Sequence, residues 1–221
     1  VPLAPLLGAL LAGLFGRYIG RNWSHRIIIS LVFASFLASI AIFFDVLDGN
    51  TFNGSVYTWL ISGDIRFEVG FLIDQLSATM MIVVSFVSLM VHIYTIGYMR
   101  EDAGYQRFFS YISLFTFSMM MLVMSNNFLQ LFFGWEAVGL VSYLLIGFWY
   151  TRPTAIYANM KAFLVNRVGD FGFLLGIAMV LMYFGSLDYA TVFLQAPEKV
   201  EETIAIIPGT SWFVITVICI L

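Results

Sequence analysis

Long apolar runs separated by short polar segments constrain this chain more than any other feature of its sequence. A helix that crosses the hydrocarbon core of a bilayer needs about 20 predominantly apolar residues. Six runs meet this need: Pro2–Ile19, Ile27–Phe44, Phe71–Tyr98, Phe108–Met124, Phe128–Trp149 and Ile156–Phe184. Only 10% of the residues are charged, against about 25% in soluble domains. The sequence therefore predicts an all-α, polytopic transmembrane helix bundle.

The helix count suggests one membrane domain covering residues 1–221, with six complete transmembrane helices. A seventh apolar run begins near Ile204 and continues to Leu221. Because the chain starts at Val1 and ends inside an apolar run, we interpret it as the N-terminal part of a longer protein.

Lysine and arginine are distributed unequally between the connecting segments. The first, third and fifth segments hold seven basic residues, whereas the second, fourth and sixth hold two, together with eight acidic residues. Because basic residues accumulate in cytoplasmic loops, the odd segments are predicted to be cytoplasmic and the N-terminus to lie on the opposite side. The seven are Arg17, Arg21, Arg26, Arg100, Arg107, Arg152 and Lys161, and the two are Arg66 and Lys199.

The second connecting segment, from Asp45 to Gly70, is too long for a simple turn. Val56–Ile61 and Ile65–Val69 are typical of short strands, and they flank Ser62-Gly63-Asp64. This pattern predicts a β-hairpin on the outer surface.

Composition and motifs exclude several classes of function. The net charge of −3 gives no basic surface for nucleic acid, and the single cysteine, Cys219, excludes a disulfide framework and a Cys-x-x-Cys site. The sequence contains no glycine-rich nucleotide-binding loop and no His-Glu-x-x-His zinc motif.

Glu136 is the first of three ionisable residues predicted to lie well inside the membrane. It is eight residues from the outer end of its apolar run, which is roughly 12 Å along a helix. Gly139, Tyr143 and Gly147 follow on nearly the same face, so a second helix can approach closely there. We interpret Glu136 as a proton-relay acid; the alternative is a carboxyl group that only holds helices together.

Arg167 and Asp170 are the other two, on the last complete apolar run. They are three residues apart, a spacing that suits an ion pair within one helix, and they share a stripe with Asn159, Phe163 and Asn166. This pair can act as an electrostatic gate that exchanges partners with Glu136, or as a fixed structural pair. Both interpretations stay open on the sequence alone.

Lys161 and His92 are weaker candidates for the relay. Lys161 is predicted near the cytoplasmic end of its helix, where its side chain can reach the interface. His92 is predicted near the cytoplasmic end of the third apolar run, where a lone histidine is more often a packing residue.

These residues lie in segments that resemble the subunit L family of bacterial NADH:quinone oxidoreductase, whose mitochondrial counterpart is subunit 5. The matching segments cover most of the stretch from Val69 to Phe184. They are Phe71–Ser77, Val91–Met99, Gly134–Leu140, Ser142–Trp149 and Met160–Asp170.

The resemblance implies an antiporter-like proton channel in the membrane arm of the oxidoreductase, in a bacterial inner membrane rather than a mitochondrial one. In the family, the acid that matches Glu136 pairs with a lysine on a later helix, and the acid that matches Asp170 is also functional. Flavin mononucleotide, iron–sulfur clusters and quinone are bound by other subunits, so no cofactor or metal is expected in this chain. The expected partners are other membrane-arm subunits, the lipid bilayer and protons.

Two alternatives remain at this point. The large subunit of a multisubunit cation/proton antiporter shares the same acid and lysine chemistry but uses an ion gradient instead of NADH oxidation. A non-conducting assembly scaffold is the other, although burying three ionisable groups has a high energetic cost without an obvious structural need.

Overall fold

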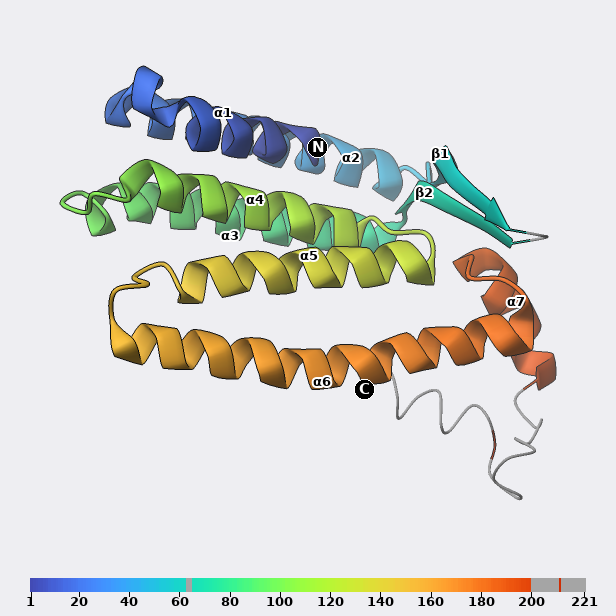
Figure 1. Cartoon of the computed structure of the whole chain (residues 1–221). Coiled ribbons are helices and arrows are strands. Elements are labelled where there is room, and N and C mark those ends of the chain that lie inside the picture. Colours follow the sequence, from blue (N-terminus) through green and yellow to red (C-terminus); the bar gives the residue numbers. More distant parts are fainter. Residues whose placement is uncertain (63–64, 200–210, 212–221) are drawn as a thin grey trace.

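A computed structural model describes residues 1–62, 65–199 and 211 of the chain (Figure 1). The helices in this part are α1 (Leu3–Ile19), α2 (Arg21–Leu47), α3 (Gln75–Tyr98), α4 (Tyr105–Val123), α5 (Phe128–Ile146), α6 (Pro153–Phe184) and α7 (Tyr189–Lys199), and the strands are β1 (Phe52–Ser62) and β2 (Ile65–Ile73). The seventh apolar run, predicted from Ile204, lies outside the described residues.

Helices α1 to α6 occupy the positions of the six predicted runs and lie roughly antiparallel, each beside the next in the bundle (Figure 1). Four of them, α2, α3, α5 and α6, are long and apolar enough to cross a membrane, by length and composition. Helix α1 is apolar but shorter, with 17 residues. The predicted class, an all-α transmembrane bundle with one small hairpin, is confirmed.

Helix α4 is central in the described bundle, because it packs against α1, α2, α3 and α5. Two of its buried hydroxyl groups bond to the backbone of α1: Ser110 donates to the carbonyl oxygen of Ala9, and Ser113 to that of Pro5, both at 2.7 Å. The backbone of α1 thus satisfies these two polar side chains of α4.

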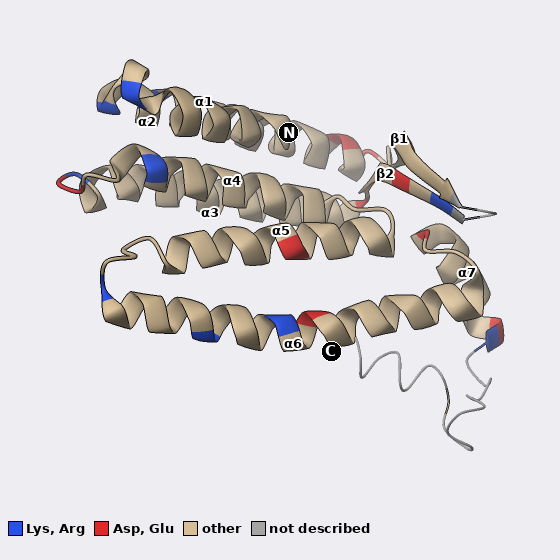
Figure 2. Ribbon diagram, viewed as in Figure 1, with Lys and Arg blue, Asp and Glu red and all other residues tan. Residues whose placement is uncertain are grey.

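The two ends of the bundle differ in charge, as Figure 2 illustrates. The α1–α2, α3–α4 and α5–α6 connections gather at one end, which carries most of the arginines; we call it the basic end. The hairpin, the α4–α5 connection and the α6–α7 connection gather at the opposite end, which we call the hairpin end. The fold thus segregates odd and even connections, as the orientation predicted from the charges requires.

The predicted hairpin is present and longer than expected. Strands β1 and β2 pair antiparallel, from Phe52 opposite Ile73 to Ser62 opposite Ile65. The third apolar run was therefore predicted to begin its helix too early, because residues 71–73 continue β2. Asp74 starts α3 instead: its carboxylate accepts the amide N–H of Ser77, and the Ser77 hydroxyl accepts the Asp74 N–H, which together form a capping box.

Other helix ends also differ from the apolar runs. Helix α2 begins at Arg21, six residues earlier than predicted, because Gly20 (φ 79°) ends α1 directly before it. The Arg21 guanidinium donates hydrogen bonds to the carbonyl oxygens of Arg100 and Asp102, which stabilises a charged residue at this helix start. Helix α5 ends at Ile146 and not at Trp149. The end of an apolar run is thus a poor marker of a helix end when a polar residue finds hydrogen-bond partners at the membrane surface.

Asp102 organises the α3–α4 connection at the basic end. The Trp149 indole N–H donates to one carboxylate oxygen at 2.9 Å, and the Gly104 amide donates to the other at 2.6 Å. These two hydrogen bonds, followed by the charges of Arg107 and Arg21, hold the pKa of Asp102 below its usual value. Since the pKa is lower in the folded protein, this contribution to stability is complete above the usual aspartate pKa and is lost as the pH falls below it.

We expect the variant Asp102→Asn to lose this pH dependence. Hydrogen-exchange protection of the Gly104 amide, relative to the intrinsic rate at each pH, should fall about fivefold in the unsubstituted protein once Asp102 is protonated, the size of one ordinary hydrogen bond. In Asp102→Asn, protection should be the same at neutral and at acidic pH. A pH-dependent fall of equal size in both proteins would contradict this role of Asp102.

Candidate functional site

The three predicted intramembrane charges meet halfway along α5 and α6, which lie side by side at the free edge of the bundle (Figure 2). Glu136 is on α5, eight residues after its first residue, Phe128. That separation is about 12 Å along the axis. Arg167 and Asp170 are on α6. The site is therefore inside the apolar part of both helices and away from both charged ends.

Arg167 bridges the two acids. Its Nη1 atom forms an ion pair and hydrogen bond with Oε2 of Glu136, and it lies 3.5 Å from Oδ2 of Asp170. The side chains are shielded to different degrees: Asp170 is 9% exposed, Glu136 21% and Arg167 35%. The contact predicted from the i,i+3 spacing is present, and the interhelical contact with Glu136 makes Arg167 the shared cation of both carboxylates.

Two aromatic side chains complete the surroundings of these charges. The Trp135 indole N–H donates to Oδ1 of Asp170 at 2.8 Å. The Phe163 ring lies beneath the Arg167 guanidinium, 4.9 Å from its central carbon, an arrangement in which the ring face attracts the cation. Sequence reasoning did not identify this contact between Trp135 and Asp170. The position of Trp135 directly before Glu136 was the available signal.

Small residues allow α5 and α6 to approach each other between the ion pair and the basic end. A Cβ atom at Gly147 would lie only 2.4 Å from the side-chain Nδ2 atom of Asn159 on α6. Gly139 and Tyr143 line a cavity of about 10 Å³ beside Arg167, enough for about one water molecule. The predicted face of Gly139, Tyr143 and Gly147 thus does meet a second helix.

The cluster has an unbalanced charge. With both acids ionised, Glu136, Asp170 and Arg167 sum to −1, and one added proton makes the sum zero. Low-dielectric surroundings favour the neutral combination. In addition, Nε of Arg167 is buried without a hydrogen-bond partner among the described residues. Within the described residues, the Arg167 guanidinium therefore retains a free donor for a water or a further group.

Lys161 and His92 lie apart from this cluster. Lys161 is exposed on α6, eight residues from Pro153. His92 is fully buried between α3 and α4: its Nδ1 lies 2.7 Å from the carbonyl oxygen of Ser88, whose hydroxyl is 2.6 Å from that of Thr116. The Nε2 atom of His92 is buried with no hydrogen-bond partner among the described residues. Relay roles for Lys161 and His92 remain predictions.

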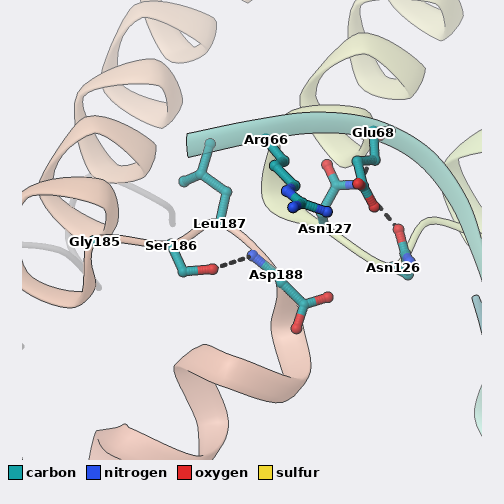
Figure 3. Close-up of a pocket in the computed structure, with 8 residues that line it drawn as sticks. All are labelled: Arg66, Glu68, Asn126, Asn127, Gly185, Ser186, Leu187 and Asp188. Carbon is teal, nitrogen blue, oxygen red and sulfur yellow. Dashed lines mark hydrogen bonds between the residues drawn. The ribbon is translucent and has the colours of Figure 1, made fainter. Parts of the chain in front are cut away.

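A second polar feature is a cavity of about 320 Å³ at the hairpin end, lined by Arg66, Glu68, Asn126, Asn127, Gly185, Ser186, Leu187 and Asp188 (Figure 3). Polar side chains that line it make structural hydrogen bonds. The Asn127 side chain caps α5 and donates to the backbone of Glu68, and the Asp188 carboxylate accepts from the amide and hydroxyl of Thr191 at the start of α7. Sequence reasoning did not identify this cavity or α7.

Comparisons with protein families match two parts of the chain. Residues 59–109 match the family described as NADH-ubiquinone oxidoreductase (complex I), chain 5 N-terminus. Residues 125–219 match the family described as NADH:quinone oxidoreductase/Mrp antiporter, TM. The second match contains all three charges of the cluster.

Named relatives match nine-tenths or more of the chain. NADH-quinone oxidoreductase subunit L of Neisseria meningitidis serogroup B is 60% identical over 100% of this chain and 33% of its own length. NADH-ubiquinone oxidoreductase chain 5 of Dictyostelium discoideum is 44% identical over 91% of this chain and 30% of its own. The chain thus spans about a third of the length of these relatives.

Two solved structures share the fold. A chain in the membrane-bound sulfane sulfur reductase, an archaeal respiratory membrane complex, superposes with a TM-score of 0.80 at 17% identity, covering 99% of this chain and 42% of its own. A chain in the Mrp complex from Dietzia sp. gives a TM-score of 0.75 at 19% identity, covering 98% and 22%.

The apolar helices indicate a multi-pass membrane protein. The chain is more similar to the bacterial relative (60% identity) than to the eukaryotic one (44%), which places it in the bacterial inner membrane. The family matches and the identity over the full chain agree on descent. The chain belongs to the family of NADH:quinone oxidoreductase subunit L and its eukaryotic counterpart, chain 5.

Proposed function

We propose that the chain forms the N-terminal part of a proton-translocating, antiporter-like subunit in the membrane arm of an NADH:quinone oxidoreductase. The observation that carries this proposal is the cluster of Glu136, Arg167 and Asp170 inside two apolar helices. Buried ionisable groups in transmembrane helices are rare, and they mark ion and proton pathways. The family membership adds the type of complex.

The mechanism follows from the charge of the cluster. While Glu136 is ionised, it shares the Arg167 guanidinium with Asp170. When Glu136 binds a proton, its carboxyl group no longer attracts the cation, and Arg167 remains with Asp170. When a new positive charge arrives nearby, it favours ionised Glu136 and releases the proton.

In the full-length protein, the lysine that the resemblance implies on a later helix would supply that new charge. Water has to reach Glu136 first from one side and then from the other. The cavity beside Arg167, together with its Nε atom, which has no partner among the described residues, provides a polar place for water on the side of the basic end. This directional hydration is what turns proton binding into transport.

Redox chemistry is proposed to occur elsewhere in the complex. Flavin mononucleotide, iron–sulfur clusters and quinone would be held by other subunits, and this chain would contribute proton binding and charge movement. Its proposed partners are the neighbouring membrane-arm subunits, the lipid bilayer and protons. The structural likeness to the Mrp complex makes a cation/proton antiporter the function to test against.

We expect NADH alone to drive acidification of inverted membrane vesicles from a bacterium that lacks its own subunit and carries the full-length version of this one. The acidification should need no sodium gradient and should stop when a quinone-site inhibitor is added. A vesicle that acidifies only when a sodium gradient is imposed, with or without NADH, would replace this proposal with the cation/proton antiporter.

A further inference from the structure

We propose that Trp135 is a positioning residue of the relay: its indole N–H fixes the Asp170 carboxylate, and through Asp170 it sets how Arg167 divides its attraction between the two acids. This role rests on the proposed function, because it concerns the same cluster. The proposal assigns no proton transfer to Trp135 itself, whose N–H acts only as a hydrogen-bond donor.

The two oxygens of Asp170 have different partners. Oδ1 accepts the Trp135 indole N–H at 2.8 Å, and Oδ2 lies 3.5 Å from Nη1 of Arg167. The Asp170 side chain is only 9% exposed. A buried carboxylate that is fixed through one oxygen has little freedom to rotate, so the indole determines where the other oxygen meets the guanidinium.

Trp135 and Glu136 are consecutive residues of α5, and both bond to α6. Glu136 pairs with Arg167, Arg167 contacts Asp170, and Asp170 accepts from Trp135. These contacts form a closed ring between the two helices. Neighbouring helical residues point about 100° apart, so a rotation of α5 that moves Glu136 away from Arg167 also strains the Trp135 bond. The indole therefore couples the geometry of the acid to that of the gating pair.

One aromatic contact supports the half-exposed Trp135 ring independently of its N–H group. The Phe173 ring of α6 meets the Trp135 ring edge-on, with centroids 6.2 Å apart. A phenylalanine at position 135 keeps an aromatic ring for this contact. The substitution Trp135→Phe therefore removes the hydrogen bond and leaves most of the packing.

The chain provides a matched control in Trp149. Its indole N–H donates to Oδ2 of Asp102 at 2.9 Å, a bond of the same kind in the α3–α4 connection at the basic end. We would compare Trp135→Phe and Trp149→Phe in the assembled oxidoreductase, using the full-length subunit and equal amounts of complex. Proton movement is measured as vesicle acidification per NADH oxidised.

We expect Trp135→Phe to lower the proton flux through this subunit about tenfold, the size expected when a charged group loses one hydrogen bond, and Trp149→Phe to leave it unchanged. In complexes that already carry Asp170→Ala, Trp135→Phe should change the flux less than about twofold, because the acceptor is gone. Ultraviolet resonance Raman spectra report the indole hydrogen bond directly. The Raman signal that is lost in Trp135→Phe belongs to Trp135. In Asp170→Ala, that signal should shift to the position of an indole without a hydrogen bond.

Two results would overturn the positioning role while the proposed function stands: normal flux in Trp135→Phe when Glu136→Gln is impaired, or a Trp135 Raman signal that Asp170→Ala does not change. A normal flux in Glu136→Gln is a different failure. It overturns the relay itself, and the inference about Trp135 falls with it.

Discussion

Replacing Glu136 by glutamine is expected to stop proton movement through this subunit without disturbing its fold. Glutamine has nearly the same size and can still accept a hydrogen bond from Arg167, but it cannot bind and release a proton near neutral pH. A positioned proton-transfer group commonly contributes at least about 100-fold to a rate. Vesicle acidification per NADH oxidised should therefore fall by the fraction of the complex's proton transport that passes through this subunit.

The control for this experiment is Glu101→Gln, which removes the same charge from the exposed α3–α4 connection. Glu136→Asp adds a graded test, because it keeps the acid and draws it back from Arg167 by one methylene group. We expect Glu101→Gln to pump normally and Glu136→Asp to be intermediate. If Glu136→Gln pumps as well as Glu101→Gln at equal assembly, Glu136 is a structural residue and the proposed relay is wrong.

The substitution Gly134→Ala is expected to have the largest effect on stability. Gly134 is buried on α5 where it meets α4, and a Cβ atom there would lie 2.8 Å from both Cα and Cβ of Leu122. The obstacle is partly backbone, so a side-chain rotation cannot relieve it. Overpacking of this kind costs about 1–3 kcal/mol, and the displaced helix also carries Glu136.

Gly169→Ala is the matched control, because a Cβ atom at Gly169 on α6 would meet nothing within 4 Å. An alanine in a helix is more favourable than a glycine by about 1 kcal/mol, so this variant should be neutral or slightly stabilising. Thermal unfolding of the purified complex in detergent and the amount of assembled complex compare the two. Equal melting temperatures for Gly134→Ala and Gly169→Ala would show that α4 and α5 do not pack as closely as described.

The sequence was sufficient for features that depend on local composition. Apolar runs predicted α1 to α6, because the length of a spanning helix is set by the bilayer. The Arg167–Asp170 contact was also predictable, because residues three apart on one helix are neighbours wherever the helix packs. Helix ends were predicted less well, since Asp74 and Arg21 place them through hydrogen bonds that hydropathy does not record.

Only the tertiary structure decided which groups surround these charges. The contact between Glu136 and Arg167 spans 31 positions in the sequence, and the one between Trp135 and Asp170 spans 35. Such contacts depend on the rotation and the axial offset of α5 relative to α6, and close packing at small residues such as Gly147 contributes to both. Spacing along one helix fixes a residue's neighbours on that helix, whereas its neighbours on another helix follow from how the two surfaces fit together.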